Sequence, residues 1–269
     1  MTDVWEPRGP RRGTAVLLHG MMSLSGTWWR IGPALAARGW EVWALDLLAH
    51  GSSEPYQRPL SVEALATRVV QQAPDPVDLL VGHSLGAITA ASALSRHPQL
   101  AGAVVLEDPP GRRRGDARAF ADDVERDGRT VRRDRAALER RSAVDHPGWA
   151  AQDVHWDVEG IARAQAAAIA DGLRAGLRRR NVAELIAGVR VPVLVLAGEP
   201  DRGGVLAEPD RSEVRYRLPA GRFVELPGGH CLHRDVPDRW LTTVTAFADE
   251  VLPGTRPPRP RHPDGAPPG

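Results

Sequence analysis

Cysteine, aromatic side chains and long apolar runs are all scarce in this chain of 269 residues. Its single cysteine, Cys231, excludes an internal disulfide and any metal site built from several cysteines. No stretch approaches the roughly 18 consecutive apolar residues of a membrane-spanning helix, so we expect no membrane partner. The first residues lack the apolar core of a secretion signal, which favours a cytoplasmic location.

Net charge is also small, because 35 Lys and Arg residues nearly balance 34 Asp and Glu residues. A chain without an overall positive field does not attract nucleic acid in general, so we expect no nucleic-acid partner. The chain does contain 42% hydrophobic residues, and its length suits one large α/β domain with an insertion. The sequence leaves a monomer and a homo-oligomer equally open.

The most informative stretch is residues 77–94, where an apolar run ends in Gly-His-Ser-Leu-Gly and an alanine-rich helical pattern follows. This order predicts a strand, a sharp turn and a helix, with Ser84 held in a strained backbone conformation at the turn. We expect the strand and the helix to approach too closely for side chains at Gly82 and Gly86. Free N–H groups at the helix start then lie beside Ser84, so its hydroxyl is poised to attack a carbonyl carbon.

Strand and helix patterns alternate along most of the chain. Short apolar runs predict strands at residues 14–18, 40–46, 77–81, 101–106, 191–197 and 222–226. Helical spacing of apolar residues predicts helices at 31–38, 61–72, 87–94 and 235–251. This alternation is typical of an α/β fold with a doubly wound, mostly parallel sheet.

Residues 111–188 differ from the rest of the chain in composition, because they are rich in Arg, Asp, Glu and Ala and contain few runs of β-branched residues. They predict an all-helical cap that leaves the sheet at a strand's carboxyl end and covers the site. Its less charged parts, residues 149–156 and 161–173, are predicted to line a substrate pocket. The remaining boundaries are predicted as a flexible N-terminal segment at 1–13, a core at 14–110 and 189–252, and a disordered tail at 253–269.

Five short motifs follow one another along the chain. They are His19-Gly20, Asp46 followed by His50-Gly51, Gly-x-Ser-x-Gly around Ser84, Gly-x-x-Asp ending at Asp201, and Gly-Gly-His ending at His230. Over roughly residues 14–250, this order resembles the α/β-hydrolase fold superfamily. Members usually have an antiparallel hairpin before the His-Gly strand, and only 13 residues precede Thr14 here. Either this hairpin is missing or the reading frame begins late, and we expect an exposed sheet edge at this point.

The resemblance implies a catalytic triad at the matching positions, with Ser84 as nucleophile, His230 as general base and Asp201 as the acid. Asp108 is the alternative acid, because it ends the strand after the elbow, a place that some superfamily members use. The chemistry requires the same residue types, since a serine hydroxyl needs a base and the imidazole needs a carboxylate to fix its tautomer. This mechanism requires no metal and no organic cofactor.

The resemblance also implies an oxyanion hole made by the backbone N–H groups of Met21 and Leu85. Trp28 and Trp156 are predicted to line the substrate pocket. Trp29 is a further candidate, and the alternative is a core role for at least one of Trp28 and Trp29.

Other residues near these motifs are predicted to have structural roles. His83 should point away from the site, and His19 should hold its loop by a hydrogen bond. Asp46 should fix the loop that carries His50. The family usually has glycine where this chain has Ala49, which predicts a slightly different path for that loop.

The predicted function is a serine hydrolase that cleaves a carboxylic ester or a lactone of a small, largely apolar substrate through an acyl-enzyme. The same triad suits a C–C bond hydrolase or a cofactor-free perhydrolase, so these activities stay open. Outside enzymes, the alternative is a small-molecule receptor that retains the triad. The cap sequence contains no motif that identifies the substrate.

Overall fold

The computed structural model describes residues 2–112, 116–177, 182–218 and 221–252. Within them, seven strands form one sheet in the order β1-β3-β2-β4-β5-β6-β7. The strands are β1 (Thr2–Trp5), β2 (Gly13–Leu18), β3 (Trp40–Leu45), β4 (Val77–His83), β5 (Ala101–Glu107), β6 (Val193–Ala197) and β7 (Arg222–Glu225). β1 runs antiparallel to β3, and the other neighbouring strands are parallel. The predicted mostly parallel sheet is confirmed.

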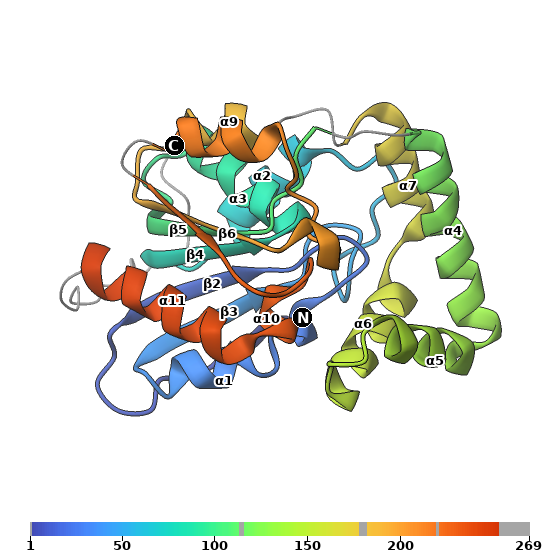
Figure 1. The fold of residues 1–269 in the computed structure, drawn as a ribbon, viewed down its shortest axis with the longest axis horizontal. Helices are drawn as coiled ribbons and strands as arrows, with labels where there is room; N and C mark the ends of the chain where they lie inside the picture. Colours follow the sequence, from blue (N-terminus) through green and yellow to red (C-terminus); the bar gives the residue numbers. More distant parts are fainter. Residues whose placement is uncertain (1, 113–115, 178–181, 219–220, 253–269) are drawn as a thin grey trace.

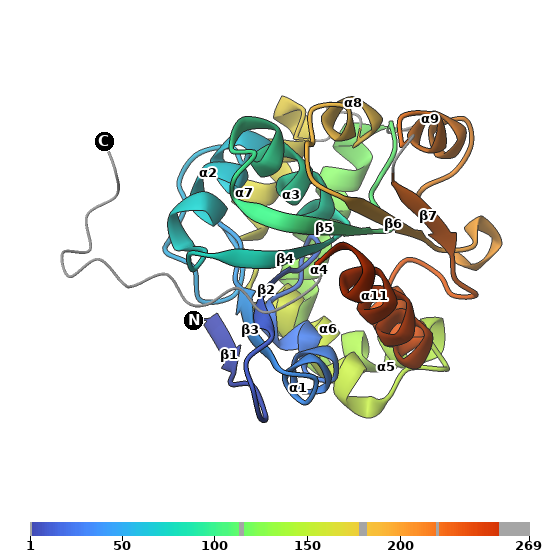
Figure 2. The ribbon, with the colours of Figure 1, turned by 90° about the vertical axis from the view of Figure 1, so that its left-hand side faces the viewer.

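Helices cover both faces of the sheet (Figures 1 and 2). One face carries α2 (Val62–Gln72), α3 (Leu85–Arg96), α8 (Val182–Ile186) and α9 (Asp210–Tyr216). The opposite face carries α1 (Ile31–Ala36) and α11 (Pro237–Val251). Three short helices lie in the segments after strands: η1 (Ser25–Trp28), η2 (Pro200–Arg202) and α10 (Leu232–Asp235).

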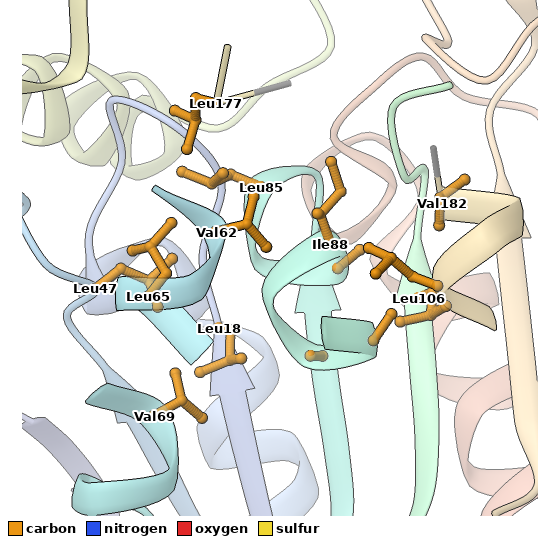
Figure 3. Packing of buried hydrophobic residues seen from close by; sticks show 14 of the residues in the cluster. Leu18, Leu47, Val62, Leu65, Val69, Leu85, Ile88, Leu106, Leu177 and Val182 are labelled. Carbon is orange, nitrogen blue, oxygen red and sulfur yellow. The ribbon is translucent and has the colours of Figure 1, made fainter. Parts of the chain in front are cut away.

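Each face of the sheet has its own hydrophobic core. Along β2, Val16 and Leu18 belong to the core under α2 and α3, whereas Ala15 and Leu17 belong to the core under α1 and α11. This alternation follows from the period of two in a strand, and it explains why β2 is buried along its whole length. Figure 3 shows the first core, in which Leu18, Leu85 and Ile88 from β2 and α3 pack with side chains of α2. Full burial of such an aliphatic side chain stabilises the fold by about 1.5–3 kcal/mol.

A helical cap lies beyond the carboxyl ends of the strands (Figure 1). It consists of α4 (Ala117–Arg133), α5 (Arg135–Asp145), α6 (Ala151–Arg163) and α7 (Ala166–Ala175). Within the cap, α4 packs on α7 and α5 packs on α6. The predicted helical insertion is thus present, but α8, which falls inside the predicted range 111–188, packs on α3 in the core instead.

The cap is attached to the core through both α6 and α7. On α6, Asp153 accepts a hydrogen bond from the indole N–H of Trp29 at 2.8 Å. On α7, the carbonyl of Ala168 accepts from the N–H of Leu60 at 3.1 Å. These contacts lie at two separated points, so the cap is held in one orientation over the sheet edge.

The N-terminal segment is not the flexible segment that the sequence predicts. Thr2 to Trp5 form β1, which pairs with β3 and covers the edge that we expected to be exposed. The indole of Trp5 packs so closely on Gly32 of α1 that a Cβ there would lie 2.4 Å from the ring. The prediction was wrong because a four-residue edge strand carries too short a pattern to be identified from sequence.

Two further expectations concern the end of the chain and membranes. The predicted disordered tail at 253–269 lies outside the described residues. Within the ranges that the structure describes, no helix combines the length and the apolar character needed to cross a bilayer.

Replacement of Trp5 by alanine tests whether β1 contributes to the fold. We expect Trp5→Ala to lower the free energy of unfolding by about 2 kcal/mol, because it removes a half-buried ring from the second core. The neighbouring Val4 is 40% exposed, so Val4→Ala should change it by less than about 0.5 kcal/mol. Urea unfolding measures the unfolding free energy of both variants. Equally small changes in the two would show that the side chains of β1 do not pack on the core.

Candidate active site

Ser84 lies at the turn between β4 and α3, with φ +52° and ψ −112°. This is the strained conformation expected at such a turn. A Cβ at Gly82 would lie 2.3 Å from the carbonyl oxygen of Gly86, and a Cβ at Gly86 would lie 2.3 Å from that of Leu18. The two glycines are therefore required by close backbone approach, as the sequence predicts.

His230 bridges Ser84 and Asp108. Its Nε2 lies 2.9 Å from Ser84 Oγ, and its Nδ1 lies 2.7 Å from Asp108 Oδ2. Both distances are those of hydrogen bonds. A carboxylate only accepts, so Nδ1 carries the hydrogen, and Nε2 is left to accept the hydrogen of the Ser84 hydroxyl. The arrangement places an accepting ring nitrogen on the serine hydroxyl and a carboxylate on the opposite nitrogen of the same ring.

Asp108 is held rigidly at the end of β5. Its side chain is fully buried, and its oxygens accept from the N–H of Gly198 at 3.2 Å and from the N–H of Val205 at 2.8 Å. The carboxylate is thus fixed by the loop after β6 while its remaining lone pairs face His230.

Asp201 is not the partner of His230. It lies in η2, where its side chain is exposed. Among the described residues, the carboxylate that is hydrogen-bonded to His230 is that of Asp108. The structure therefore places the alternative, Asp108, on His230 in place of the preferred Asp201, and the role of Asp108 as the triad acid stays a prediction. The sequence did not separate them because both follow an apolar strand, and only the path of η2 carries Asp201 to the surface.

Two backbone N–H groups lie where the oxyanion hole is predicted. Leu85 is the first residue of α3, so its N–H has no acceptor within the helix. Met21 lies in the loop after β2, and no hydrogen-bond acceptor for its N–H occurs in the described part of the chain. Both residues line the cavity beside Ser84. Their role as oxyanion donors stays a prediction.

Two buried histidines hold the loops beside Ser84. His50 Nε2 accepts from the N–H of Met22 at 3.1 Å, and His50 Nδ1–H donates to the Leu48 carbonyl at 2.8 Å. His19 Nε2 accepts from the N–H of Leu47 at 3.0 Å, which confirms its predicted role. Burial lowers the pKa of both imidazoles, and that of His50 is about 3. Both rings are therefore neutral, as an accepting Nε2 requires.

Asp46 fixes the loop that carries His50, as predicted. Its two oxygens accept from the backbone N–H groups of Ser25 and Ser52, each at 2.8 Å. Although burial opposes it, these bonds lower the pKa of Asp46. The carboxylate is structural, because it joins the segment after β2 to the segment after β3.

Strained backbone is concentrated around the site. Within the described residues, the non-glycine residues with positive φ are Met22, Ala49, Ser84 and Asp108. Ala49, with φ +64°, adopts the left-handed conformation that glycine adopts readily, so its loop keeps this conformation without glycine. Each such residue costs of order 1–3 kcal/mol, which the surrounding packing has to offset.

A cavity of about 390 Å³ lies between Ser84 and the cap. Its volume is that of a site for a small molecule. Most of its wall is apolar and comes from Met21, Met22, Leu85, Ile88, Pro110, Phe120, Ile161 and Val205. The predicted cap stretches thus contribute Trp149 and Ile161 to the lining.

Neither Trp28 nor Trp156 lines the pocket: Trp28 lies in the core, and Trp156 is a partly buried residue at the contact between α6 and η1. The described residues that line the cavity include neither of them. Trp28 is fully buried, and its ring lies 4.4 Å from that of His233 and 6.1 Å from that of Trp240. Trp156 packs on Gly26 and joins α6 to η1. The prediction failed because apolar character alone does not separate pocket from core.

One end of the cavity is polar, and the sequence analysis did not identify it. Arg234 donates to Asp157 at 3.0 Å and to Thr27 at 2.8 Å, and its guanidinium lies 4.5 Å from the Trp149 ring. Arg234 belongs to α10, whereas Asp157 and Trp149 belong to the cap. Its position four residues after His230 is the signal that could have identified it.

Three buried side chains behind His230 form the group of described residues that could hold a metal ion. The ligating atoms of His83, Glu107 and His233 lie within 4.8 Å of one another. Glu107 accepts from His233 Nδ1–H at 2.7 Å, and His83 Nε2 lies 3.0 Å from the His230 carbonyl oxygen. Burial lowers the pKa of both histidines and raises the pKa of Glu107. Glu107 is thus paired with His233, and His83 with the main chain of His230.

His83 does not point away from the site, contrary to the prediction. It lines the cavity, and its ring lies 4.6 Å from that of His230.

The sequence was compared with protein families and with curated proteins. Residues 15–243 match the Alpha/beta hydrolase family. The chain is 37% identical over 101 residues to a probable esterase PIR7A of Oryza sativa subsp. indica, a match that covers 34% of this chain and 36% of that protein. It is 36% identical over 106 residues to a pimeloyl-[acyl-carrier protein] methyl ester esterase of Klebsiella pneumoniae (strain 342), covering 39% and 40%. The matches thus span well under half the length of these curated relatives.

Solved structures share the fold over nearly the whole chain. An E-2-(acetamidomethylene)succinate hydrolase superposes with a TM-score of 0.73 at 22% identity, covering 92% of this chain and 94% of that one. An enol-lactonase from Burkholderia xenovorans LB400 gives 0.69 at 20% identity, covering 92% and 95%. At this identity the likeness concerns the fold alone.

The neutral state of His50 gives stability a pH dependence. Because the pKa of His50 is about 3 in the folded chain and about 6.5 in an unfolded one, only the unfolded chain takes up this proton as pH falls below 6.5. The free energy of unfolding is therefore unaffected by this group above pH 6.5 and falls as the pH is lowered from 6.5 toward 3. Between pH 7 and pH 5, the neutral His50 should lower the unfolding free energy of the wild type by about 2 kcal/mol.

The variant His50→Gln lacks this proton site, although its side-chain carbonyl can still accept from Met22. The difference in unfolding free energy between wild type and variant should therefore shrink by about 2 kcal/mol from pH 7 to pH 5. Urea unfolding at the two pH values measures it, and a constant difference would contradict a neutral, buried His50.

Proposed function

The chain belongs to the Alpha/beta hydrolase family, and from this premise we propose that it is a serine esterase in which Ser84, His230 and Asp108 are the catalytic triad. The observation that carries the proposal is the pair of hydrogen bonds made by His230, at 2.9 Å to Ser84 Oγ and 2.7 Å to Asp108 Oδ2. They form without any rearrangement of the chain. Such a constellation is defined by its geometry and not by sequence position.

In the first half of the reaction, His230 Nε2 takes the hydroxyl proton while Ser84 Oγ bonds to the carbonyl carbon of the ester. The resulting oxyanion accepts hydrogen bonds from the N–H groups of Met21 and Leu85, and each such donor is worth roughly 3–4 kcal/mol of barrier. Asp108 stabilises the imidazolium that forms. The bond from carbon to the alcohol oxygen then breaks, and His230 donates its proton to the leaving alcohol.

In the second half, water replaces the alcohol. His230 removes a proton from this water as the oxygen attacks the acyl carbon, and the bond to Ser84 Oγ breaks. The proton on Nε2 then returns to the serine, and the carboxylic acid leaves. Protons balance across the two halves, and every step uses groups of this chain and the substrate, so the scheme requires no metal or cofactor.

The proposed substrate is a small ester with an apolar part. The cavity has about 390 Å³ and a mainly apolar lining, which supports a small molecule over a polymer. The names of the relatives in rice and Klebsiella describe esterases, which supports an ester over the other bonds that a serine triad can cleave. Arg234 and Asp157 at the polar end of the cavity suit a substrate whose other part forms hydrogen bonds.

Substitution of the two candidate acids tests the triad. With p-nitrophenyl esters of graded acyl length, Asp108→Asn should lower kcat by about 10⁴-fold, because the imidazole loses the carboxylate that fixes its tautomer. Asp201→Asn is the matched control and should keep kcat close to that of wild type, since Asp201 is exposed in η2. A collapse of kcat in Asp201→Asn with an active Asp108→Asn would reverse the assignment.

Replacement of the nucleophile tests the reaction class. Ser84→Ala should abolish both turnover and stoichiometric labelling by a fluorophosphonate, because among the described residues the hydroxyl on His230 Nε2 is that of Ser84. Wild type should release far more than one equivalent of p-nitrophenol per chain. A labelled wild type that releases at most one equivalent would instead favour a receptor that retains the triad.

A further inference from the structure

The residues that directly precede Ser84 and Asp108 are neighbours in the sheet. His83 ends β4 and Glu107 ends β5, and the two are partners in the parallel register. The N–H of Ser84 donates to the Glu107 carbonyl at 2.9 Å, which ties the elbow to the end of β5. Paired residues of adjacent strands present their side chains to the same face. His83 and Glu107 therefore lie side by side, both buried, on the face that carries α11.

His83 contacts the main chain of His230. Its Nε2 lies 3.0 Å from the His230 carbonyl oxygen. A carbonyl only accepts, so Nε2 carries a hydrogen and donates it. Because burial lowers the pKa of His83, the ring is neutral and has one N–H, which is committed to this bond. The side chain before the nucleophile thus holds the backbone of the histidine that the nucleophile needs.

Glu107 contacts the chain three residues beyond His230. Its Oε1 accepts from the N–H of His233 at 3.0 Å and from the His233 Nδ1–H at 2.7 Å. Its Oε2 accepts from the indole N–H of Trp240 at 2.9 Å. The carboxylate therefore fixes the start of α10 and joins it to α11.

His230 needs such contacts because the glycines before it allow many backbone conformations. Gly228 and Gly229 come directly before it, between β7 and α10, and glycine has the widest choice of backbone conformations. The His230 side chain is 31% exposed, so packing alone does not lock the ring.

We propose that His83 and Glu107 are positioning residues for His230: they hold the main chain at and after this residue so that its Nε2 stays within hydrogen-bond distance of Ser84. The inference rests on the proposed function, since the position of His230 affects turnover only if it serves Ser84. Neither residue touches the reacting atoms, so each acts through the placement of the imidazole. Displacement of a catalytic group by about 1 Å can cost about 10²-fold in rate.

A matched pair of variants at His83 tests the proposal. Glutamine retains an N–H donor near the position of Nε2, whereas leucine retains volume without a donor. His83→Leu should lower kcat for a p-nitrophenyl ester by about 10- to 100-fold with little change in KM, and His83→Gln should recover most of the loss. A merely structural role would not separate two folded variants in this way.

Proton NMR supplies a readout that does not depend on turnover. The His230 Nδ1–H that donates to Asp108 should give a far-downfield signal in wild type and in His83→Gln. In His83→Leu this signal should shift or broaden, because the imidazole is no longer held on Asp108. The same measurement applies to Glu107→Gln, in which an amide replaces the carboxylate that accepts from Trp240 and His233.

Asp78→Asn is the control for loss of stability alone. Asp78 lies at the amino end of β4, where its carboxylate accepts from the N–H of Thr14 at 2.8 Å, far along the strand from Ser84. The Asp78→Asn variant should have a lower unfolding free energy than wild type, with the same kcat and the same downfield signal. Glu107→Gln should lower kcat by about 10-fold or more. If Glu107→Gln does not fold, the His83 pair decides the question.

The outcomes separate this inference from the proposed function. Wild-type kcat and an unchanged downfield signal in His83→Leu would overturn the positioning role. If wild type hydrolyses no ester, the proposed function fails, but the NMR comparison still shows whether His83 holds His230 on Asp108.

Discussion

Parallel pairing brings the carboxyl ends of β2, β4, β5 and β6 to one edge of the sheet, and the site depends on this constraint. Ser84 and Asp108 each follow the last residue of a strand, so the distance between them is set by the spacing of adjacent strands and not by flexible loops. His230 is separated from Asp108 by 122 positions in the chain, and it needs only to reach this prearranged pair. Ligand sites of open α/β sheets lie at the same edge for the same reason.

The same edge is also where the fold stores strain. Met22, Ala49, Ser84 and Asp108 have positive φ, and a folded domain has only about 5–15 kcal/mol of stability to offset such costs. The compensation is local. Neutral imidazoles of His19 and His50 and the carboxylate of Asp46 satisfy the backbone N–H groups of the loops around Ser84, and the two sheet cores lie directly beneath. Buried polar groups that are fully paired make these loops rigid.

Local chemistry made Ser84, Gly82, Gly86 and the sheet predictable, because each is defined by residues within one turn or one strand. The choice between Asp201 and Asp108 was not local. It depends on how η2 turns away from the site and on the N–H groups of Gly198 and Val205, which no spacing rule reveals. Trp28 and Trp156 were misplaced for a related reason, since the same apolar ring suits a core and a pocket. β1 was missed because a short edge strand is stabilised by its partner β3 and by α1, and hardly at all by its own pattern.

The attachment of the cap at both α6 and α7 has a consequence for selection among substrates. A lid that moves about one hinge can adapt the pocket volume to each ligand, but closing it costs part of the free energy of binding. Here α6 and α7 are each hydrogen-bonded to the core, so ordering of the cap adds little to the free-energy cost of binding. A pocket with a fixed volume of this kind selects molecules by size, because the cap does not move to accommodate a longer one.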